Sequence, residues 1–159
     1  MANTNVSLDL ELKTQVIDEL QLQLANYQVF YAKLQNFHWH IKGRHFFELH
    51  QKFEEMYDSV FEKIDATAER IVGLGGRANG TLAEYLKLST LDEASTESSE
   101  EEMVTQIIED LETVIAAHRN AIEACESEEG HSDEFTIDML VGFLRDLEKD
   151  LWMLTQFNQ

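Results

Sequence analysis

The chain contains no proline in 159 residues and only seven glycines. These two residue types most often interrupt helices and form the tight turns between strands. Their scarcity argues against an all-β fold and favours a few long helices. Hydrophobic residues make up 43% and charged residues 27% of the chain, as in ordinary globular proteins. We therefore expect a single domain over residues 1–159, which is long enough to bury a substantial core.

Four segments carry apolar or aromatic residues at intervals of three and four, the spacing of an amphipathic helix. The first predicts a helix over about residues 8–38, and the second predicts one over about residues 46–73. The third runs through 104–125 and the fourth through 140–154, with Gly130 between them. Four long amphipathic helices without an internal repeat predict a four-helix bundle.

The connection between the second and third helices is longer than the others. Residues 81–89 within it have the pattern of a short amphipathic helix, and an acidic, hydroxyl-rich stretch follows over residues 92–102. Ser99 and Glu102 have the spacing of a capping box at the start of the third helix. The predicted fold is therefore all-α, a four-helix bundle with a short extra helix in the long connection between helices 2 and 3.

The charge balance indicates which partners the chain attracts. Twelve Lys and Arg residues against 31 Asp and Glu residues give a formal net charge of −19. Such a surface repels phosphate backbones and anionic lipids and attracts cations.

Cys125 is the only cysteine, so no disulfide can form within the chain. The first 30 residues lack the basic and apolar regions of a secretion signal, and no stretch approaches the ~20 apolar residues of a membrane span. We expect a cytoplasmic protein that does not enter a membrane.

The second predicted helix carries four metal-ligating residue types on one face, because His50, Glu54, Asp65 and Glu69 fall within an arc of about 100°. Glu54 and Asp65 are 11 positions apart, about 16 Å along the axis, whereas ligand bonds to a metal are ~2 Å long. One copy of the helix therefore cannot close a site. If two copies pack antiparallel about a two-fold axis, the His50/Glu54 end of one meets the Asp65/Glu69 end of the other.

Imidazoles and carboxylates together suit ferrous iron, manganese or zinc. Each residue also has a purely structural interpretation. His38 and His50, on the apolar faces of their helices, read singly as hydrogen-bonded core histidines. Asp65 and Glu69 read as a solvated face that pairs with Lys63 and Arg70.

Between residues 38 and 76 the chain carries a series of short motifs: His38-Trp39-His40-Ile41-Lys42-Gly43, Leu49-His50, Asp65, Ala68-Glu69-Arg70 and Leu74-Gly75-Gly76. In this order and without gaps, they resemble the Dps family of miniferritins. The resemblance extends more loosely over nearly the whole chain, including the short helix in the long connection and Leu151-Trp152.

This resemblance implies that the four-helix bundle is ferritin-like. It also implies a homo-dodecameric shell that oxidises Fe(II), preferably with hydrogen peroxide, and stores ferric mineral inside. It implies ferroxidase sites at two-fold interfaces, with His38 and His50 from one subunit and Asp65 and Glu69 from its neighbour. Glu54 takes the remaining carboxylate position, where the family usually has aspartate, so its extra methylene shifts that carboxylate.

Other residues follow from the same resemblance. The start of the fourth helix would line three-fold pores with the carboxylates of Glu129, Glu134 and Asp138, unless these acids only favour the helix dipole. Trp39 would lie near the site, where it either quenches radicals or simply packs. His118 reads as a core residue, because it lies on the apolar face of its helix.

Two other functions remain open from the sequence. Some members of the family coat DNA through a lysine-rich tail, but residues 1–12 contain no Lys or Arg, so we expect no direct DNA binding and chemical protection instead. The other alternative is a non-catalytic helical scaffold whose acids only keep it soluble. Iron-dependent consumption of peroxide distinguishes the ferroxidase from the scaffold.

Overall fold

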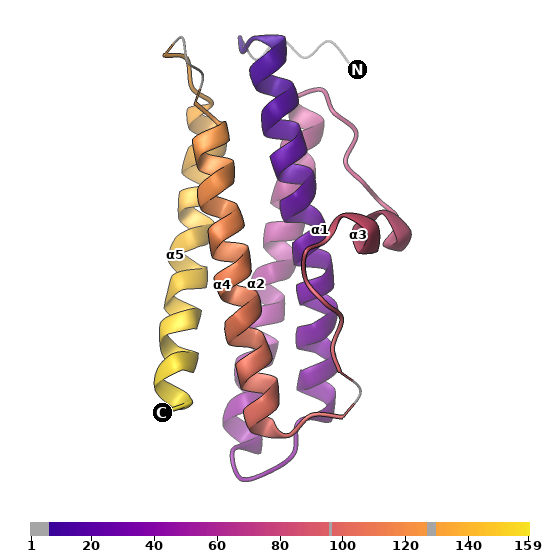
Figure 1. Cartoon of the computed structure of the whole chain (residues 1–159), viewed down its shortest axis with the longest axis vertical. Helices are drawn as coiled ribbons and strands as arrows, with labels where there is room; N and C mark the ends of the chain where they lie inside the picture. The colour runs from indigo at the N-terminus through magenta and orange to yellow at the C-terminus, as the bar shows by residue number, and fades with distance from the viewer. Residues whose placement is uncertain (1–6, 96, 127–129) are drawn as a thin grey trace.

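The structure is a computed structural model that describes residues 7–95, 97–126 and 130–159. Its helices in these ranges are α1 (Leu10–His40), α2 (Phe46–Gly73), α3 (Leu82–Leu88), α4 (Glu100–Ala124) and α5 (Glu134–Phe157). The four long helices lie side by side as a bundle, and α3 lies outside it against α1 (Figure 1). The predicted fold class, an all-α bundle with a short helix in the connection between the second and third long helices, is confirmed.

The helix ends show why the chain divides where it does. The predicted capping box at Ser99 and Glu102 is present at the start of α4, and a second one, between Thr81 and Glu84, starts α3. Asp9 caps α1 by accepting a hydrogen bond from the Leu12 amide at 2.7 Å. These caps satisfy amide groups that a helix leaves without partners at its first turn.

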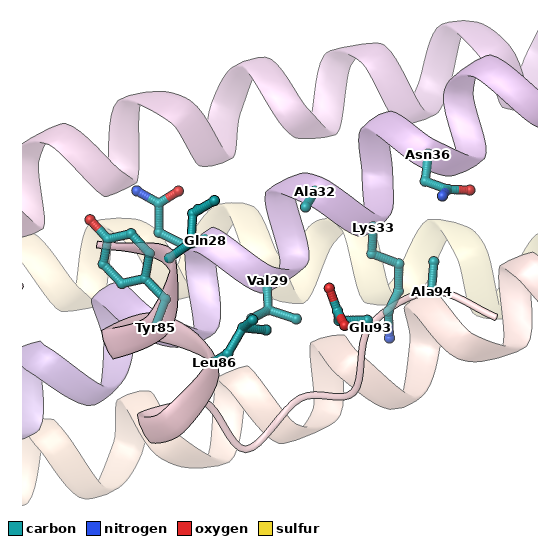
Figure 2. A pocket seen from close by; sticks show the side chains of 10 residues that line it. Gln28, Val29, Ala32, Lys33, Asn36, Tyr85, Leu86, Glu93 and Ala94 are labelled. Carbon is teal, nitrogen blue, oxygen red and sulfur yellow. The ribbon is translucent and has the colours of Figure 1, made fainter. Parts of the chain in front are cut away.

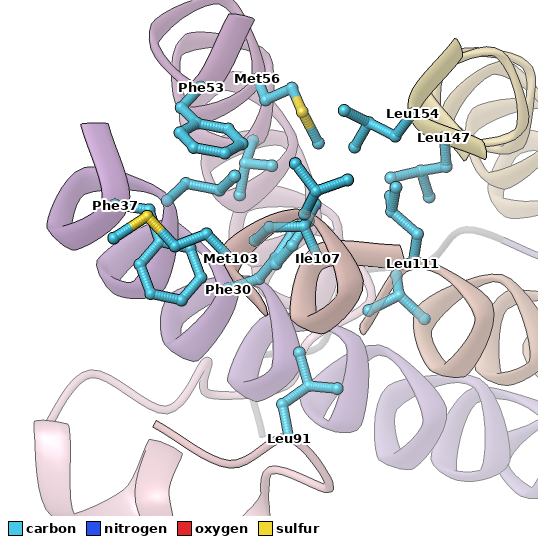
Figure 3. Packing of buried hydrophobic residues seen from close by; sticks show 14 of the residues in the cluster. Phe30, Phe37, Phe53, Met56, Leu91, Met103, Ile107, Leu111, Leu147 and Leu154 are labelled. Carbon is cyan, nitrogen blue, oxygen red and sulfur yellow. The ribbon is translucent and has the colours of Figure 1, made fainter. Parts of the chain in front are cut away.

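The core lies between the four long helices (Figure 3). Side chains from all four meet there: Phe30 and Phe37 of α1, Phe53 and Met56 of α2, Ile107 and Leu111 of α4, and Leu147 and Leu154 of α5. Burying a side chain of this size stabilises the fold by about 1.5–3 kcal/mol. In the described ranges no helix is both long and apolar enough to cross a membrane.

Some of the polar groups buried in this core pair with one another. His118 is fully buried, with Nε2 at 2.6 Å from the Tyr27 hydroxyl and Nδ1 at 2.8 Å from the Val114 carbonyl oxygen, which confirms its prediction as a core residue. The buried Lys33 ammonium pairs with Asp110 at 2.7 Å, between α1 and α4.

Two further ion pairs fix α2 against α5. Arg70, in the last turn of α2, pairs with Asp133, the N-cap of α5, at 2.7 Å. Lys63, buried in the middle of α2, pairs with Asp146 at 2.9 Å. The face of α2 that carries the predicted ligands is thereby held in a defined rotation.

Candidate metal site

His38 and His50 come together where the end of α1 meets the start of α2. Residues 41–45 turn the chain back, so that the two helices run antiparallel (Figure 1). The imidazole rings stack with their centroids 3.8 Å apart and an interplanar angle of 16°. Nδ1 of His38 lies 2.7 Å from the His50 carbonyl oxygen, and Nδ1 of His50 lies 2.8 Å from the His38 carbonyl oxygen.

These reciprocal hydrogen bonds fix the tautomer of both rings. A carbonyl oxygen can only accept a hydrogen bond, so each Nδ1 must carry the proton and donate it. In the neutral ring Nε2 then holds the lone pair, and in the described part of the chain no hydrogen bond engages Nε2 of either histidine. An imidazole whose other nitrogen donates to a carbonyl is the usual form of a metal-ligating histidine. The pair therefore fits a metal such as iron.

Two aromatic side chains hold this pair. Phe46 stacks on His50 with centroids 5.0 Å apart, and Tyr57 lies edge-on to His38 at 5.3 Å. The apolar spacing of α2 predicts both only as core residues. The position of Phe46, four residues before His50, is the sequence signal for its contact with that ring, whereas the contact of Tyr57 with His38 of α1 has no such signal. His38 is buried and His50 is half-buried. The structural interpretation as hydrogen-bonded core histidines accounts for Nδ1 of each ring but not for Nε2.

The carboxylates of the predicted site are all exposed on α2. Glu54 lies one turn after His50, and Asp65 and Glu69 lie further along the same helix. Asp65 and Glu69 are solvated, as their structural interpretation expects, but they do not pair with Lys63 and Arg70. Lys63 is bonded to Ser59 and Asp146, and Arg70 to Thr136 and Asp133.

A single chain does not gather these ligands around one point. Over residues 7–95, 97–126 and 130–159, no three His, Cys, Asp or Glu side chains lie close enough together to hold a metal ion. The two histidines and Glu54 lie toward one end of the α2 face, and Asp65 and Glu69 lie toward the other. The rise of the helix separates Glu54 from Asp65 by about 16 Å, or about three turns.

The predicted pore residues belong to the start of α5 and the segment before it. Glu129 lies outside the described residues. Glu134 is the first residue of α5 and accepts a hydrogen bond from the Ser132 hydroxyl at 2.8 Å, which lowers the pKa of its carboxyl. Asp138 is exposed one turn later. Both acids therefore lie at the helix start as expected, where Glu134 also interacts favourably with the helix dipole.

Trp39 has its side chain 64% exposed in the protomer. It lies next to His38 in sequence, in the last turn of α1. Its two suggested roles near the site, quenching radicals or packing, stay predictions.

A cleft that the sequence does not predict lies elsewhere, between α1 and α3 (Figure 2). It has a volume of about 340 Å³ and is lined by Val29, Lys33, Tyr85 and Leu86 among others. Val29 precedes His38 by nine positions, so at 100° per residue their side chains leave α1 in directions about 180° apart. The cleft is thus on the far side of α1 from the histidine pair and offers no ligand to it.

The bundle and its histidine pair, with carboxylates along α2, are those of a ferritin-like protein. Residues 17–159 match the family described as ferritin-like domain. The chain is also 40% identical, over 146 residues, to a DNA protection during starvation protein 2 of Bacillus anthracis, covering 92% of this chain and 98% of that one. The chain belongs to the Dps family.

Solved structures agree with this assignment. Dps from Staphylococcus aureus superposes with a TM-score of 0.86 at 39% identity, covering 91% of this chain and 95% of that one. A Dps protein from Vibrio cholerae O1, described as a member of the ferritin-like diiron-carboxylate superfamily, superposes with a TM-score of 0.91 at 32% identity. That match covers 100% of this chain and 99% of the other.

Proposed function

We propose that this protein is a ferroxidase and iron-storage miniferritin. It oxidises Fe(II) with hydrogen peroxide at sites shared by two subunits, and it keeps the ferric mineral inside a dodecameric shell. The observation that carries the proposal is the His38/His50 pair, whose reciprocal hydrogen bonds engage Nδ1 of both rings and leave both Nε2 atoms available as metal ligands. In a purely structural histidine pair, we would expect hydrogen-bond partners for these nitrogens as well, because buried polar atoms are usually hydrogen-bonded.

The second half of each site comes from a neighbouring subunit. Asp65 and Glu69 are exposed carboxylates, and no ion pair within the described ranges engages them. Packing two α2 helices antiparallel about a two-fold axis brings these carboxylates to His38, His50 and Glu54 of the partner. Each interface then contains two identical sites.

The chemistry follows from this set of ligands. Carboxylates stabilise Fe(III) more than Fe(II), because the higher charge interacts more strongly with anionic oxygen. Two Fe(II) ions give one electron each to one hydrogen peroxide, its O–O bond breaks, and two protons complete two water molecules. Supplying both electrons together avoids the free hydroxyl radical that a single transfer releases.

Assembly and DNA protection complete the proposal. Large apolar side chains are exposed on the protomer, including Phe61 at 60% and Trp152 at 63%, and such surfaces mark contacts between proteins. Glu129, Glu134 and Asp138 would admit cations through the shell. The B. anthracis relative is named for DNA protection during starvation, and we extend that role to this chain, in the cytoplasm, through the removal of iron and peroxide.

The test is an anaerobic Fe(II) titration of the purified protein, followed by addition of peroxide or oxygen and monitored by ferric absorbance. We expect a large closed assembly in sedimentation and faster oxidation with peroxide than with oxygen. A variant with His50→Ala and Glu54→Ala should be inactive, whereas Glu55→Ala, which removes the next carboxylate in sequence, should keep full activity. Sedimentation of monomers only, or oxidation no faster than in buffer, would contradict the proposal.

A further inference from the structure

Tyr57 occupies a position on α2 that the proposed ligand set does not use. It follows Glu54 by three residues and His50 by seven, so the three side chains lie within an arc of about 60° around the helix. Its ring is half-buried. It is therefore next to two proposed ligands along one stripe of α2.

The ring of Tyr57 also contacts His38, a proposed ligand from the other helix, α1. It meets His38 of α1 edge-on, with centroids 5.3 Å apart and planes at 85°. It also meets Tyr31 of α1 edge-on, with centroids 5.9 Å apart and planes at 83°. Edge-to-face contacts of this kind are favourable and directional. Tyr57 thus bridges α1 and α2 at the point where His38 needs a fixed orientation.

Glu54 precedes Tyr57 by about one turn of α2, so the two side chains are neighbours on the same face of the helix. A phenol hydroxyl next to a carboxylate acts as a hydrogen-bond donor to it. Glutamate has one more rotatable bond than aspartate, so a donor three residues away restricts a side chain that is otherwise free to move.

We infer that Tyr57 is a positioning residue of the proposed iron site, with its ring orienting His38 and its hydroxyl restraining the Glu54 carboxylate. The inference rests on the proposed function, because it concerns the same ligands. It extends the site beyond the residues that bind metal. One side chain of α2 controls the geometry of ligands from both α1 and α2.

The experiment measures Co(II) binding to the assembled protein under anaerobic conditions, through the visible absorption of the bound ion. Tyr57→Phe removes the hydroxyl and keeps the ring. We expect about tenfold weaker binding, which is the scale of losing a group that orients metal ligands. Tyr57→Leu removes the ring as well and should weaken binding further and change the shape of the spectrum, because His38 loses its edge contact.

Tyr31→Phe is the matched control. Its hydroxyl accepts a hydrogen bond from Gln35 Nε2 at 3.2 Å and its ring contacts Tyr57 rather than a ligand, so affinity should change less than twofold. A second control is Glu54→Asp, whose carboxylate is one methylene shorter. In that background, Tyr57→Phe should lose most of its effect, because the carboxylate no longer reaches the hydroxyl.

Sedimentation and thermal unfolding of each variant separate positioning from folding. Weaker Co(II) binding by Tyr57→Phe, with assembly and unfolding temperature unchanged, supports the inference. Equal affinity in Tyr57→Phe and wild type, where His50→Ala does abolish binding, overturns the inference and leaves the proposed function standing. If His50→Ala binds Co(II) as well as wild type does, the proposed site itself is wrong, and the inference falls with it.

Discussion

The hydroxyl of Tyr27 lies 2.6 Å from Nε2 of His118, in the centre of the bundle. Because Nδ1 of His118 donates to the Val114 carbonyl, Nε2 must accept, and the Tyr27 hydroxyl is the donor. The ring is neutral in this arrangement. Burial lowers the pKa of His118 from 6.5 to about 4, although the hydrogen bond to Val114 opposes the shift.

This shift predicts a loss of stability in mild acid. In the unfolded chain His118 takes up a proton near pH 6.5, whereas the folded protein resists protonation down to about pH 4. The unfolded state therefore binds more protons between these values, and the free energy of unfolding falls as the pH falls through this window, by about 3 kcal/mol in total. Below about pH 4 both states are protonated, so this group causes no further loss.

Urea unfolding of wild type and of His118→Gln, at several pH values from 7 to 4, checks this prediction. Glutamine keeps a donor and an acceptor but does not titrate, so the difference in stability between the two proteins should shrink toward pH 4. A difference that is the same at every pH would show that His118 does not titrate differently on unfolding.

Two glycines should respond to alanine in opposite directions. Gly43 has φ +137°, and a Cβ there would lie 2.5 Å from Oε2 of Glu100, the carboxylate that also bonds His45. Gly43→Ala should destabilise the protein by about 1–3 kcal/mol through backbone strain. At Gly142, within α5, a Cβ would point into space that no other part of the described chain approaches within 4 Å, so Gly142→Ala should stabilise by about 0.5–1 kcal/mol. Urea unfolding of the two variants gives the change in the free energy of unfolding for each substitution. If both variants were stabilised, or both destabilised, the prediction would be wrong.

The sequence predicts most of this fold because its helices are long and their ends carry local signals. The capping box at Ser99 is an example, since its two partners are only three residues apart. The pairing of His38 with His50 is also within reach of the sequence as a hypothesis about ligands. The hydrogen bonds that fix their tautomers are not, because they depend on how tightly residues 41–45 turn.

The difference between local signals and contacts set by packing also explains why the partners of Lys63 and Arg70 are not predicted from the sequence. Proximity in sequence suggests that these cations pair with Asp65 and Glu69. Their actual partners, Asp146 and Asp133, are more than 60 positions away and are selected by the packing of α5 on α2. Helical periodicity describes one helix at a time and carries no information about such contacts.

The charge of the chain predicts that it does not bind DNA directly. A net charge of −19 per chain repels the phosphates, and residues 1–12 contain no Lys or Arg that could replace counterions on them. We expect no mobility shift of duplex DNA at physiological salt without metal ions. A variant extended at its N-terminus by a lysine-rich tail is the positive control and should shift the same duplex. A shift by the unmodified protein at stoichiometric concentration would refute the prediction.

The last prediction tests whether the ligands meet across two subunits. One variant carries His50→Ala and Glu54→Ala, and the other carries Asp65→Ala and Glu69→Ala. Each alone should be inactive in Fe(II) oxidation, because every site lacks half of its ligands. In a mixed dimer, one of the two sites combines both damaged halves, while the other combines the intact halves of the two chains.

Co-assembly of the two variants should therefore restore substantial activity, and less than that of wild type, because matched pairs remain inactive. The mixture is prepared by dissociating and reassembling the two proteins together, and sedimentation checks that complete shells form. Each variant taken alone through the same procedure is the control. A site contained within one subunit cannot be rescued in this way, since every chain carries its own lesion. Correctly assembled mixed shells without recovered activity would show that these ligands do not meet at a two-fold interface.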